Sequence, residues 1–419
     1  MPQQKMRSPI KSSPSVQKGN PAAPREKEPL ALYIHIPFCE TKCPYCDFNP
    51  YAGIEQLIPT YIDALIQELG LWSVTLGPVP IGTIFFGGGT PSYVPPEHIG
   101  RLLCTVRSAF TLAANAEITL ESNPGDVTME RLARWRAAGV NRLSIGVQSL
   151  DDELLRLLGR RHTSQDAVDA FGYAQAAGFD DVNLDLMYGL PDQSIDQWRR
   201  TLQDTIALGP RHLSLYCLTL EEGTPLEAWV RDGSVPTPDP DLAADMYELA
   251  EEIAGRSGFE HYEISNWALP GHACRHNLSY WRNQSYLGVG PGAHSYLQGH
   301  RFANLSSPRE YIKRVSLRAA GASTPKDFPS ALRDGPVDMM ERVDARLEMG
   351  ETMMLGLRLA DGVTKDSFHA RFGRELQEVF GTPISELQDA GLLQWNGDRL
   401  LLTPRGRLLG NEVFQRFLT

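Results

Sequence analysis

The stretch HIPFCETKCPYCDF, residues 35–48, places three cysteines within eight positions. Cys39, Cys43 and Cys46 are half of the six cysteines in the chain of 419 residues. Three thiols are one too few for a tetrahedral site made of cysteines alone, and they are an odd number for a disulfide framework. Because thiolates are soft ligands that suit zinc and iron–sulfur clusters, the stretch predicts a metal site.

Two metal sites fit the three cysteines. A structural zinc ion needs a fourth ligand, which His35 would provide, but the C-x3-C-x2-C spacing differs from the usual paired spacing of zinc fingers. A [4Fe–4S] cluster held by three thiolates leaves its fourth iron without a protein ligand. Such an open iron can bind a substrate or a cofactor. Three thiolates for four iron atoms therefore favour a cofactor-binding cluster, with structural zinc as the alternative.

The composition is that of an ordinary globular protein, with 42% hydrophobic and 22% charged residues. A net charge of -11 disfavours general nucleic-acid binding, since phosphates require a basic face. No apolar run approaches the roughly 18–20 residues that span a bilayer. Residues 1–29 are basic until Glu26 and rich in Pro, Ser and Gln, which predicts a disordered tail, with a mitochondrial transit peptide as the alternative. We therefore expect a reducing, cytoplasmic location for the thiols.

From residue 31 onward, short apolar runs alternate with longer helical patterns. Six such units predict a parallel sheet, either doubly wound or closed into a full or partial (β/α) barrel. Both alternatives gather ligands at the carboxyl ends of the strands. The expected strands are 31–36, 83–86, 117–121, 142–147, 182–188 and 212–218, and the expected helices are 55–72, 128–139, 164–178 and 195–209.

The alternation of short apolar runs and helical patterns ends at about residue 238. A helix at 241–258 precedes a segment dense in Gly, His and aromatic residues, and 321–340 resembles a linker. Residues 341–419 are expected to form helices and a hairpin at 392–406, with Asn396-Gly397 as its turn. Helices followed by a hairpin predict a small winged-helix-like domain. Its scattered arginines give little support to DNA binding.

Polar and glycine-rich residues follow several of the expected strands. The run GGGTP, residues 87–91, predicts either a concavity of backbone N–H groups facing a ligand or a simple glycine turn. Glu121 ends the third strand, Gln148 and Asp185 occupy similar positions on the fourth and fifth strands, and Arg160 follows in the next helix. Each of the four alone is typical of a solvated or paired polar residue. Together, at successive strand ends, they indicate a pocket lining.

The cysteine motif, with Tyr45 before its last cysteine, resembles that of the radical S-adenosylmethionine (SAM) superfamily. The resemblance implies a [4Fe–4S] cluster on Cys39, Cys43 and Cys46. It implies that the amino and carboxylate groups of SAM chelate the open iron, and that an electron from the cluster cleaves SAM to a 5′-deoxyadenosyl radical. The fold it implies is a partial (β/α)6 barrel of the TIM type.

A closer resemblance covers the chain from about residue 31 to its end. The matching motifs are Tyr33-x-His35-x-Pro37-Phe38-Cys39, Gly87 to Pro91, Glu121 to Pro124, Gly146 to Ser149, Asn183 to Pro191 and Gly290 to His294. They resemble the family of oxygen-independent coproporphyrinogen III oxidase (HemN) and its relatives, the haem chaperones of the HemW family. The resemblance implies SAM contacts at Tyr33, Gly88, Gly89, Thr90, Glu121, Gln148, Arg160 and Asp185. A second SAM, as in the oxidase, stays open.

Two features separate the two relatives. The oxidase has a fourth cysteine two positions after the third, where this chain has Phe48, and residues 276–280 match the HNxxY motif of the HemW family. A neutral imidazole is a common axial ligand of haem iron, so His276, and secondly Tyr280, are expected to be linked to haem. The alternative for His276 is a buried histidine satisfied by neighbouring groups.

The resemblance thus favours a haem chaperone that passes haem to acceptor haemoproteins such as respiratory enzymes. The alternative is an enzyme of porphyrin biosynthesis that oxidatively decarboxylates coproporphyrinogen III to protoporphyrinogen IX. A third reading is a scaffold stabilised by zinc or a cluster. The residues leave peripheral membrane contact and a homodimer open.

Overall fold

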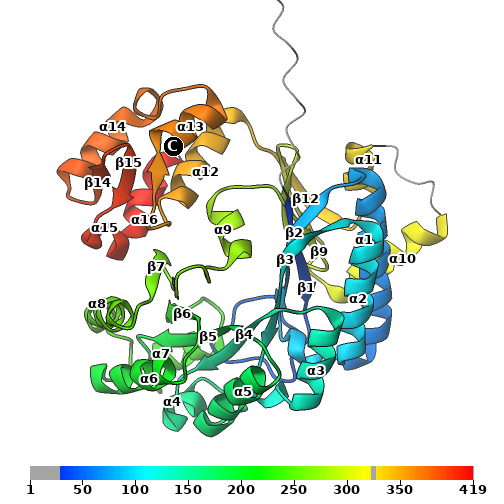
Figure 1. Ribbon diagram of the computed structural model, residues 1–419, viewed down its shortest axis with the longest axis horizontal. Helices are drawn as coiled ribbons and strands as arrows, with labels where there is room; N and C mark the ends of the chain where they lie inside the picture. The colour runs from blue at the N-terminus through cyan, green and yellow to red at the C-terminus, as the bar shows by residue number, and fades with distance from the viewer. Residues whose placement is uncertain (1–28, 322–326, 419) are drawn as a thin grey trace, which may run out of the picture.

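The computed structural model describes residues 29–321 and 327–418, which form a curved, mostly parallel sheet followed by a smaller helical unit (Figure 1). Residues 1–28 of the expected tail lie outside the described residues. The strands of the large sheet are β1 (Leu30–Ile36), β2 (Pro80–Gly88), β3 (Thr111–Ser122), β4 (Arg142–Gln148), β5 (Asp181–Tyr188), β6 (His212–Cys217), β7 (Glu260–Glu263), β8 (Asn266–Ala268), β9 (Tyr286–Val289), β10 (His294–Leu297), β11 (His300–Asn304) and β12 (Val337–Arg342).

Helices follow the first six strands, and all but α9 of those named below lie away from the concave face of the sheet (Figure 1). In this part of the chain they are α1 (Ile58–Leu76), α2 (Pro96–Ala109), α3 (Met129–Ala138), α4 (Asp152–Leu157), α5 (Ser164–Ala176), α6 (Ile195–Ala207), α7 (Pro225–Arg231), α8 (Pro240–Arg256), α9 (Arg275–Trp281), α10 (Pro308–Gly321) and α11 (Phe328–Asp334). In Figure 1, α1 to α3 lie outside the curve of the sheet, whereas α9 lies on the opposite side, between the sheet and the C-terminal helices.

The order of the strands decides between the two architectures that the sequence left open. β1 to β6 are neighbours in chain order and all pair in parallel. A doubly wound sheet would reverse its strand order at a switch point. The fold is therefore the partial (β/α)6 barrel that the resemblance implied.

Additional strands extend both edges of this six-stranded sheet. β9 pairs in parallel with β1 and continues into the antiparallel strands β10, β11 and β12, while β8 and β7 extend the β6 edge. Within the described residues β12 and β7 end the sheet and do not pair with each other, so the barrel stays open. The sequence reading missed these short strands because they lack the long apolar runs of β1 to β6.

Local sequence signals explain where several outer helices begin. Thr163 and Asp166 form a capping box at the start of α5, and Ser194 and Gln197 form another at α6. Behind these caps, α6 turns Trp198 and Leu202 into the core. Large side chains at helical spacing therefore fix each outer helix on the sheet, which holds the strand ends in place.

The stretch 321–340, expected to be a linker, holds two regular elements beside residues 322–326, which lie outside the described residues. Helix α11 buries Phe328 and Leu332 in the main core, and β12 pairs with β11 at the sheet edge. The sequence reading missed β12 because its side chains are mostly exposed, so it shows no alternating pattern.

The C-terminal residues have a hydrophobic core of their own, formed by side chains that include Met353, Phe368 and Leu400. Their elements are α12 (Ala345–Gly356), β13 (Val363–Thr364), α13 (Lys365–Phe372), α14 (Leu376–Asp389), β14 (Leu393–Asn396), β15 (Arg399–Leu402), α15 (Pro404–Leu408) and α16 (Gly410–Phe414). The expected hairpin is present, but its loop is one residue later than expected. Asn396 pairs with Arg399, so Gly397 and Asp398 form the loop, and Gly397 has a φ of 63°.

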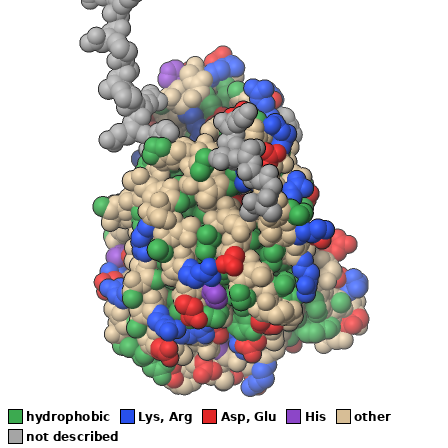
Figure 2. All heavy atoms as spheres, turned by 90° about the vertical axis from the view of Figure 1, so that its right-hand side faces the viewer, with side chains coloured by type: hydrophobic (Ala, Val, Ile, Leu, Met, Phe, Trp, Pro, Cys, Tyr) green, Lys and Arg blue, Asp and Glu red, His purple; other side chains and the backbone are tan. Residues whose placement is uncertain are grey.

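The surface shows neither a strong basic patch on the visible face nor a membrane-spanning element in the described helices. Figure 2 shows basic and acidic side chains interspersed over the face that lies on the right of Figure 1. In residues 29–321 and 327–418, each helix is too short or too polar to cross a bilayer.

Candidate functional site

The three clustered cysteines lie on the loop that leaves the carboxyl end of β1. The loop returns beside its own start, because Tyr51 N–H donates to Pro37 O at 2.7 Å and Cys39 N–H donates to Tyr51 O at 3.0 Å. Inside the loop, Cys46 N–H donates to Cys43 O at 3.1 Å. Tyr45 packs on an apolar cluster that includes Leu154 and Leu226. The loop is thus anchored on both sides, which presents the three thiols from one short segment.

The glycine run after β2 packs directly against this cysteine loop. Gly89 N–H donates to Ile36 O and Thr90 N–H donates to Phe38 O, both at 2.8 Å, and the Thr90 hydroxyl lies 3.2 Å from Cys39 Sγ. A Cβ on Gly89 would lie 2.8 Å from Phe38 O. Gly89 is therefore required for the close approach of two backbone segments.

The expected concavity of free N–H groups is not formed in this run. Gly88 N–H donates to Glu121 Oε2 at 3.2 Å, so the backbone N–H groups of Gly88, Gly89 and Thr90 all have protein acceptors. The run positions the cysteine loop and Glu121. Sequence alone gives the conformational freedom of glycine but not the partner of each N–H group.

The chemistry of the thiols fits an iron–sulfur cluster. Burial raises the pKa of Cys39 to about 11 and also raises that of Cys46, so these two thiols are protonated at neutral pH and lose their protons on binding metal. In the described part of the chain, no three His, Cys, Asp or Glu side chains are close enough to hold a single metal ion. A cluster instead gives each thiolate its own iron. His35 is the candidate fourth zinc ligand. Its Nδ1 forms a hydrogen bond with the hydroxyl of Tyr33, at 3.0 Å.

Polar side chains from four strands meet beside the cysteine loop. Glu121 on β3 lies next to the Gly87 backbone and Tyr33, since a Cβ on Gly87 would be 3.1 Å from both side chains. Across the barrel, Asp185 on β5 accepts hydrogen bonds from Ser144 at 3.0 Å and from Asn183 at 2.8 Å. The carboxyl ends of these parallel strands therefore bring together residues that are far apart in the sequence, as expected for this fold.

The two acids share a poorly solvated space. Burial, together with the nearby Asp185, raises the pKa of Glu121 to about 8. Burial also raises the pKa of Asp185, against the lowering effect of its hydrogen bonds to Asn183 and Ser144. The pair favours a ligand that brings hydrogen-bond donors or positive charge to this space.

Arg160 joins the side chains at the strand ends to the cysteine loop. Its Nη2 donates to Gly146 O at 2.8 Å, and its Nη1 lies 3.5 Å from Cys43 Sγ. Its Nε is buried and has no hydrogen-bond partner among the described residues. Gln148, at the end of β4, has a φ of 66°, which is strained for a residue other than glycine and occurs often at functional sites. The structure thus brings Arg160 and Gln148 together beside Gly146, because a Cβ on Gly146 would lie 3.3 Å from Arg160 Nη2 and 2.9 Å from Gln148 Nε2.

His276 and Tyr280 lie deep on the concave side of the sheet, on α9. The His276 ring is 1% exposed and stacks on Phe85 of β2, with ring centroids 5.1 Å apart. Both ring nitrogens have protein partners: Nδ1 lies 2.8 Å from Thr83 Oγ1, and Nε2 lies 2.9 Å from Tyr280 OH. Burial lowers the pKa of His276 to about 3, so the imidazole is neutral at physiological pH.

Three partners of α9 were missed in the sequence. Glu117 accepts the backbone N–H groups of Arg275 and His276 at 2.9 and 3.0 Å, which satisfies the start of the helix. Thr83 and Phe85 bond and stack with His276. The available signal was alternation along β2 and β3, which turns Thr83, Phe85 and Glu117 towards the interior. The sequence did not show that α9 would pack there.

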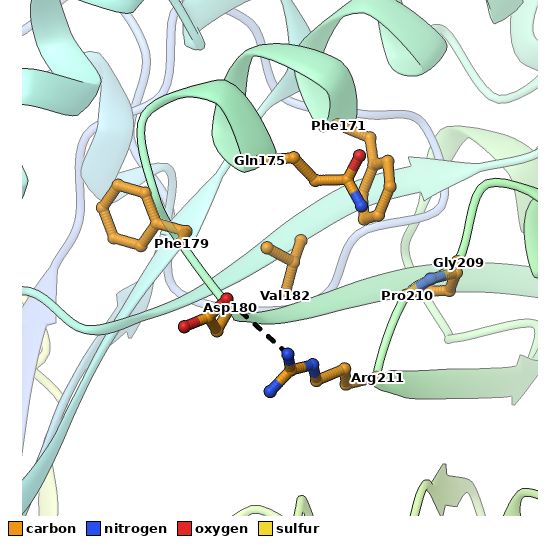
Figure 3. Close-up of a pocket in the computed structure, with 8 residues that line it drawn as sticks. All are labelled: Phe171, Gln175, Phe179, Asp180, Val182, Gly209, Pro210 and Arg211. Atoms are coloured by element: carbon orange, nitrogen blue, oxygen red, sulfur yellow. Dashed lines mark ion pairs between the residues drawn. The ribbon is translucent and has the colours of Figure 1, made fainter.

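Two cavities lie outside this strand-end site. A cavity of about 210 Å³ is found at the amino ends of β5 and β6, where Asp180 and Arg211 form an ion pair at 3.6 Å (Figure 3). It is smaller than typical ligand pockets. A larger cavity of about 730 Å³ lies between α9, β7 and the C-terminal unit.

Comparisons with known proteins agree with this geometry. The profile described as "Radical SAM superfamily" matches residues 33–205, and that of the "HemN C-terminal domain" matches residues 343–409. "Heme chaperone HemW" of Bacillus subtilis is 37% identical, covering 93% of this chain and 99% of the relative. "Radical S-adenosyl methionine domain-containing protein 1, mitochondrial" of Bos taurus is 38% identical, covering 99% and 98%.

The solved structure of coproporphyrinogen III oxidase (HemN) from Escherichia coli shares the fold, with a TM-score of 0.80 and 24% identity, covering 94% of this chain and 91% of that chain. This likeness concerns the fold alone. The identity to the HemW proteins extends over almost their whole length, including the C-terminal unit. The chain belongs to the HemW family of the radical SAM superfamily.

Proposed function

We propose that this protein is a haem chaperone, which binds haem and passes it to acceptor haemoproteins such as respiratory enzymes. The observation that carries the proposal is the near-complete match to proteins named "Heme chaperone HemW" in organisms that include Bacillus subtilis and Escherichia coli. Phe48 supports it, because the oxidase has a fourth cysteine at that position. The Phe48 side chain is 72% exposed, so packing does not account for its presence.

In this proposal Cys39, Cys43 and Cys46 hold a [4Fe–4S] cluster, as radical SAM membership implies. When bound, the cluster supplies an open iron for SAM and an electron. The chain orients that group from two sides. Thr90 fixes Cys39 at 3.2 Å, and Arg160 places a positive charge 3.5 Å from Cys43 Sγ.

The residues proposed from the family motifs to bind SAM belong to the first five strands and the segments that follow them. They are Tyr33, Gly88, Gly89, Thr90, Glu121, Gln148, Arg160 and Asp185. The two acids with raised pKa values favour hydroxyl or ammonium donors of SAM, and Arg160 has a buried Nε that lacks a partner among the described residues. The backbone N–H groups of the glycine run have protein acceptors, so the run contributes mainly by placing Glu121 and Cys39.

We expect SAM affinity to increase with pH because of Glu121. Its pKa of about 8 keeps the carboxyl neutral at lower pH, and only the ionised form accepts hydrogen bonds with both oxygens. Between about pH 6.5 and 8.5, SAM should bind about tenfold more tightly. Equilibrium binding to cluster-loaded protein measures this, and the Glu121→Gln variant should lose most of the increase. If the variant keeps the full pH dependence, a group other than Glu121 causes it. The titration of SAM itself does not affect this comparison, because it is the same with both proteins.

For haem, we propose that His276 and Tyr280 contribute as positioning residues of α9. Both nitrogens of His276 have protein partners and the ring is buried, so coordination of iron would require opening of the bond to Tyr280.

We also propose a cytoplasmic location, whose reducing conditions keep the three thiols available. Peripheral contact with a membrane would bring the protein to membrane-bound acceptors.

Haem retention and transfer test the proposed function. Anaerobically reconstituted protein is expected to bind haem stably and to convert an apo-haemoprotein to its haem form, without consuming coproporphyrinogen III. Absorption spectra follow the transfer, and product analysis follows the porphyrin. Formation of protoporphyrinogen IX together with SAM consumption would contradict the chaperone proposal and establish the oxidase alternative.

A further inference from the structure

The larger cavity separates α9 and β7 from the C-terminal unit and has a volume of about 730 Å³. This volume lies within the usual range of roughly 300–1,000 Å³ for ligand pockets. We propose that this cavity receives the haem macrocycle, and that Arg282 and Arg399 pair with its two propionate carboxylates. The inference rests on the proposed function and names the place where the cargo docks.

The cavity offers apolar contacts from both of its walls. Leu278 and Trp281 line it from α9, and Leu359, Val363 and Phe368 line it from the C-terminal unit. The indole of Trp281 is held in place by Arg358, whose guanidinium carbon lies 5.3 Å from the ring centroid. A flat apolar macrocycle gains most of its binding energy from such side chains on both faces.

Three arginines line the same cavity, and their present contacts distinguish them. Arg371 is already committed, because it donates to the carbonyls of Arg282 and Asn283 and to Glu348 at 2.7 to 3.1 Å. Arg282 is exposed, and its side chain has no hydrogen bond or ion pair within residues 29–321 and 327–418. Arg399 pairs at 3.1 Å with Asp361, which is 85% exposed and loses little if the pair opens.

Arg282 and Arg399 therefore remain available for anionic groups of a ligand. Guanidinium groups bind carboxylates through paired, charge-assisted hydrogen bonds. Glu260 and Asp361 are also among the lining residues, so the cavity is not uniformly basic. It favours a ligand that is apolar over most of its area and carries its negative charge at one edge, as haem does.

The two faces of α9 connect this cavity with the barrel interior. His276 and Tyr280 face β2, whereas Leu278, Trp281 and Arg282 face the cavity. Haem that docks in the cavity does not disturb the hydrogen bonds of His276 to Thr83 and Tyr280. Porphyrin contacts and carboxylate pairs then hold the haem, and α9 links the haem to β2, whose carboxyl end packs beside the cysteine loop.

Titration of the full-length, cluster-loaded protein with ferric haem tests the assignment. Arg282→Glu should weaken haem binding at least about tenfold, as expected for the loss of a charge-assisted pair, and Arg282→Lys should restore part of the affinity. Ser367→Trp, at an exposed lining residue, should block the cavity and weaken haem to a similar extent. The matched control is Arg405→Glu, which makes the same charge change at an exposed position outside the cavity.

Haem dimethyl ester, which lacks the propionate charges, separates the two parts of the site. Its affinity should be insensitive to Arg282→Glu but reduced by Ser367→Trp. Wild-type haem affinity in both variants would overturn the cavity assignment and leave the chaperone proposal intact. Failure of the wild-type protein to bind haem would overturn the proposed function itself.

Discussion

Replacing Cys43 with alanine is expected to leave the protein without a stable [4Fe–4S] cluster and to lower its iron content on the order of tenfold or more. The variant retains two thiols, whereas the cluster needs three to keep its fourth iron as the open one. Even the loss of groups that only support metal ligands weakens sites 10- to 100-fold, so the loss of a ligand should cost at least as much. SAM binding that depends on the open iron should disappear with it.

Cys43 is the sharpest choice among the three cysteines. Its thiol is only partly buried, and it lies 3.5 Å from Arg160 Nη1. Cys39 is buried against Thr90, so its replacement would also disturb the packing of the glycine run. Cys104→Ala provides the matched control, because Cys104 is exposed on α2. Iron and sulfide analysis after anaerobic reconstitution should show full loading in the control. Full loading in Cys43→Ala would contradict the assigned ligands.

The parallel core of the fold was predictable because it repeats a strong local pattern. Each of β1 to β6 is a short segment rich in buried apolar residues, and each of the first five is followed by an amphipathic helix. Periodicity does not distinguish a doubly wound sheet from a partial barrel, because the difference depends on which distant strands pair. The family motifs predict the partial barrel. Because parallel strands present their carboxyl ends at one edge, the sequence also predicts Glu121, Gln148 and Asp185 as a set.

The position of α9 was not predictable in the same way. Its seven residues carry no long amphipathic pattern, and its place depends on Glu117, Thr83 and Phe85, which precede it by more than 150 residues. The larger cavity arises for the same reason, since its walls come from α9, β7 and the C-terminal unit. Motif spacing identifies residues that act together within one loop. It does not show which face of a helix meets which strand.

The His276→Ala variant is expected to weaken haem binding at least about tenfold and to lower the free energy of unfolding by about 2–4 kcal/mol. The substitution leaves Thr83 Oγ1 and Tyr280 OH without their partner and opens a cavity beside Phe85. Glu117 still accepts the backbone N–H groups at the start of α9, but the helix loses its side-chain contacts with β2, which loosens the wall that carries Leu278, Trp281 and Arg282. The cluster should remain, because the cysteine loop does not contact His276. Denaturant unfolding and haem titration at a temperature where the variant is folded measure the two effects separately.

Tyr280→Phe distinguishes a positioning role from coordination of iron. The substitution removes only the hydroxyl that lies 2.9 Å from His276 Nε2, and so frees that nitrogen. If His276 positions α9, Tyr280→Phe should weaken haem binding in the same direction as His276→Ala, though less, and the Soret band of the residual complex should be unchanged in both variants. If His276 binds the iron, Tyr280→Phe should keep or increase the affinity, whereas His276→Ala should shift the Soret band. The neutral state of His276, with a pKa of about 3, makes either outcome independent of pH near neutrality. The spectrum therefore reports on the ligand of the iron, and the affinity reports on the position of α9.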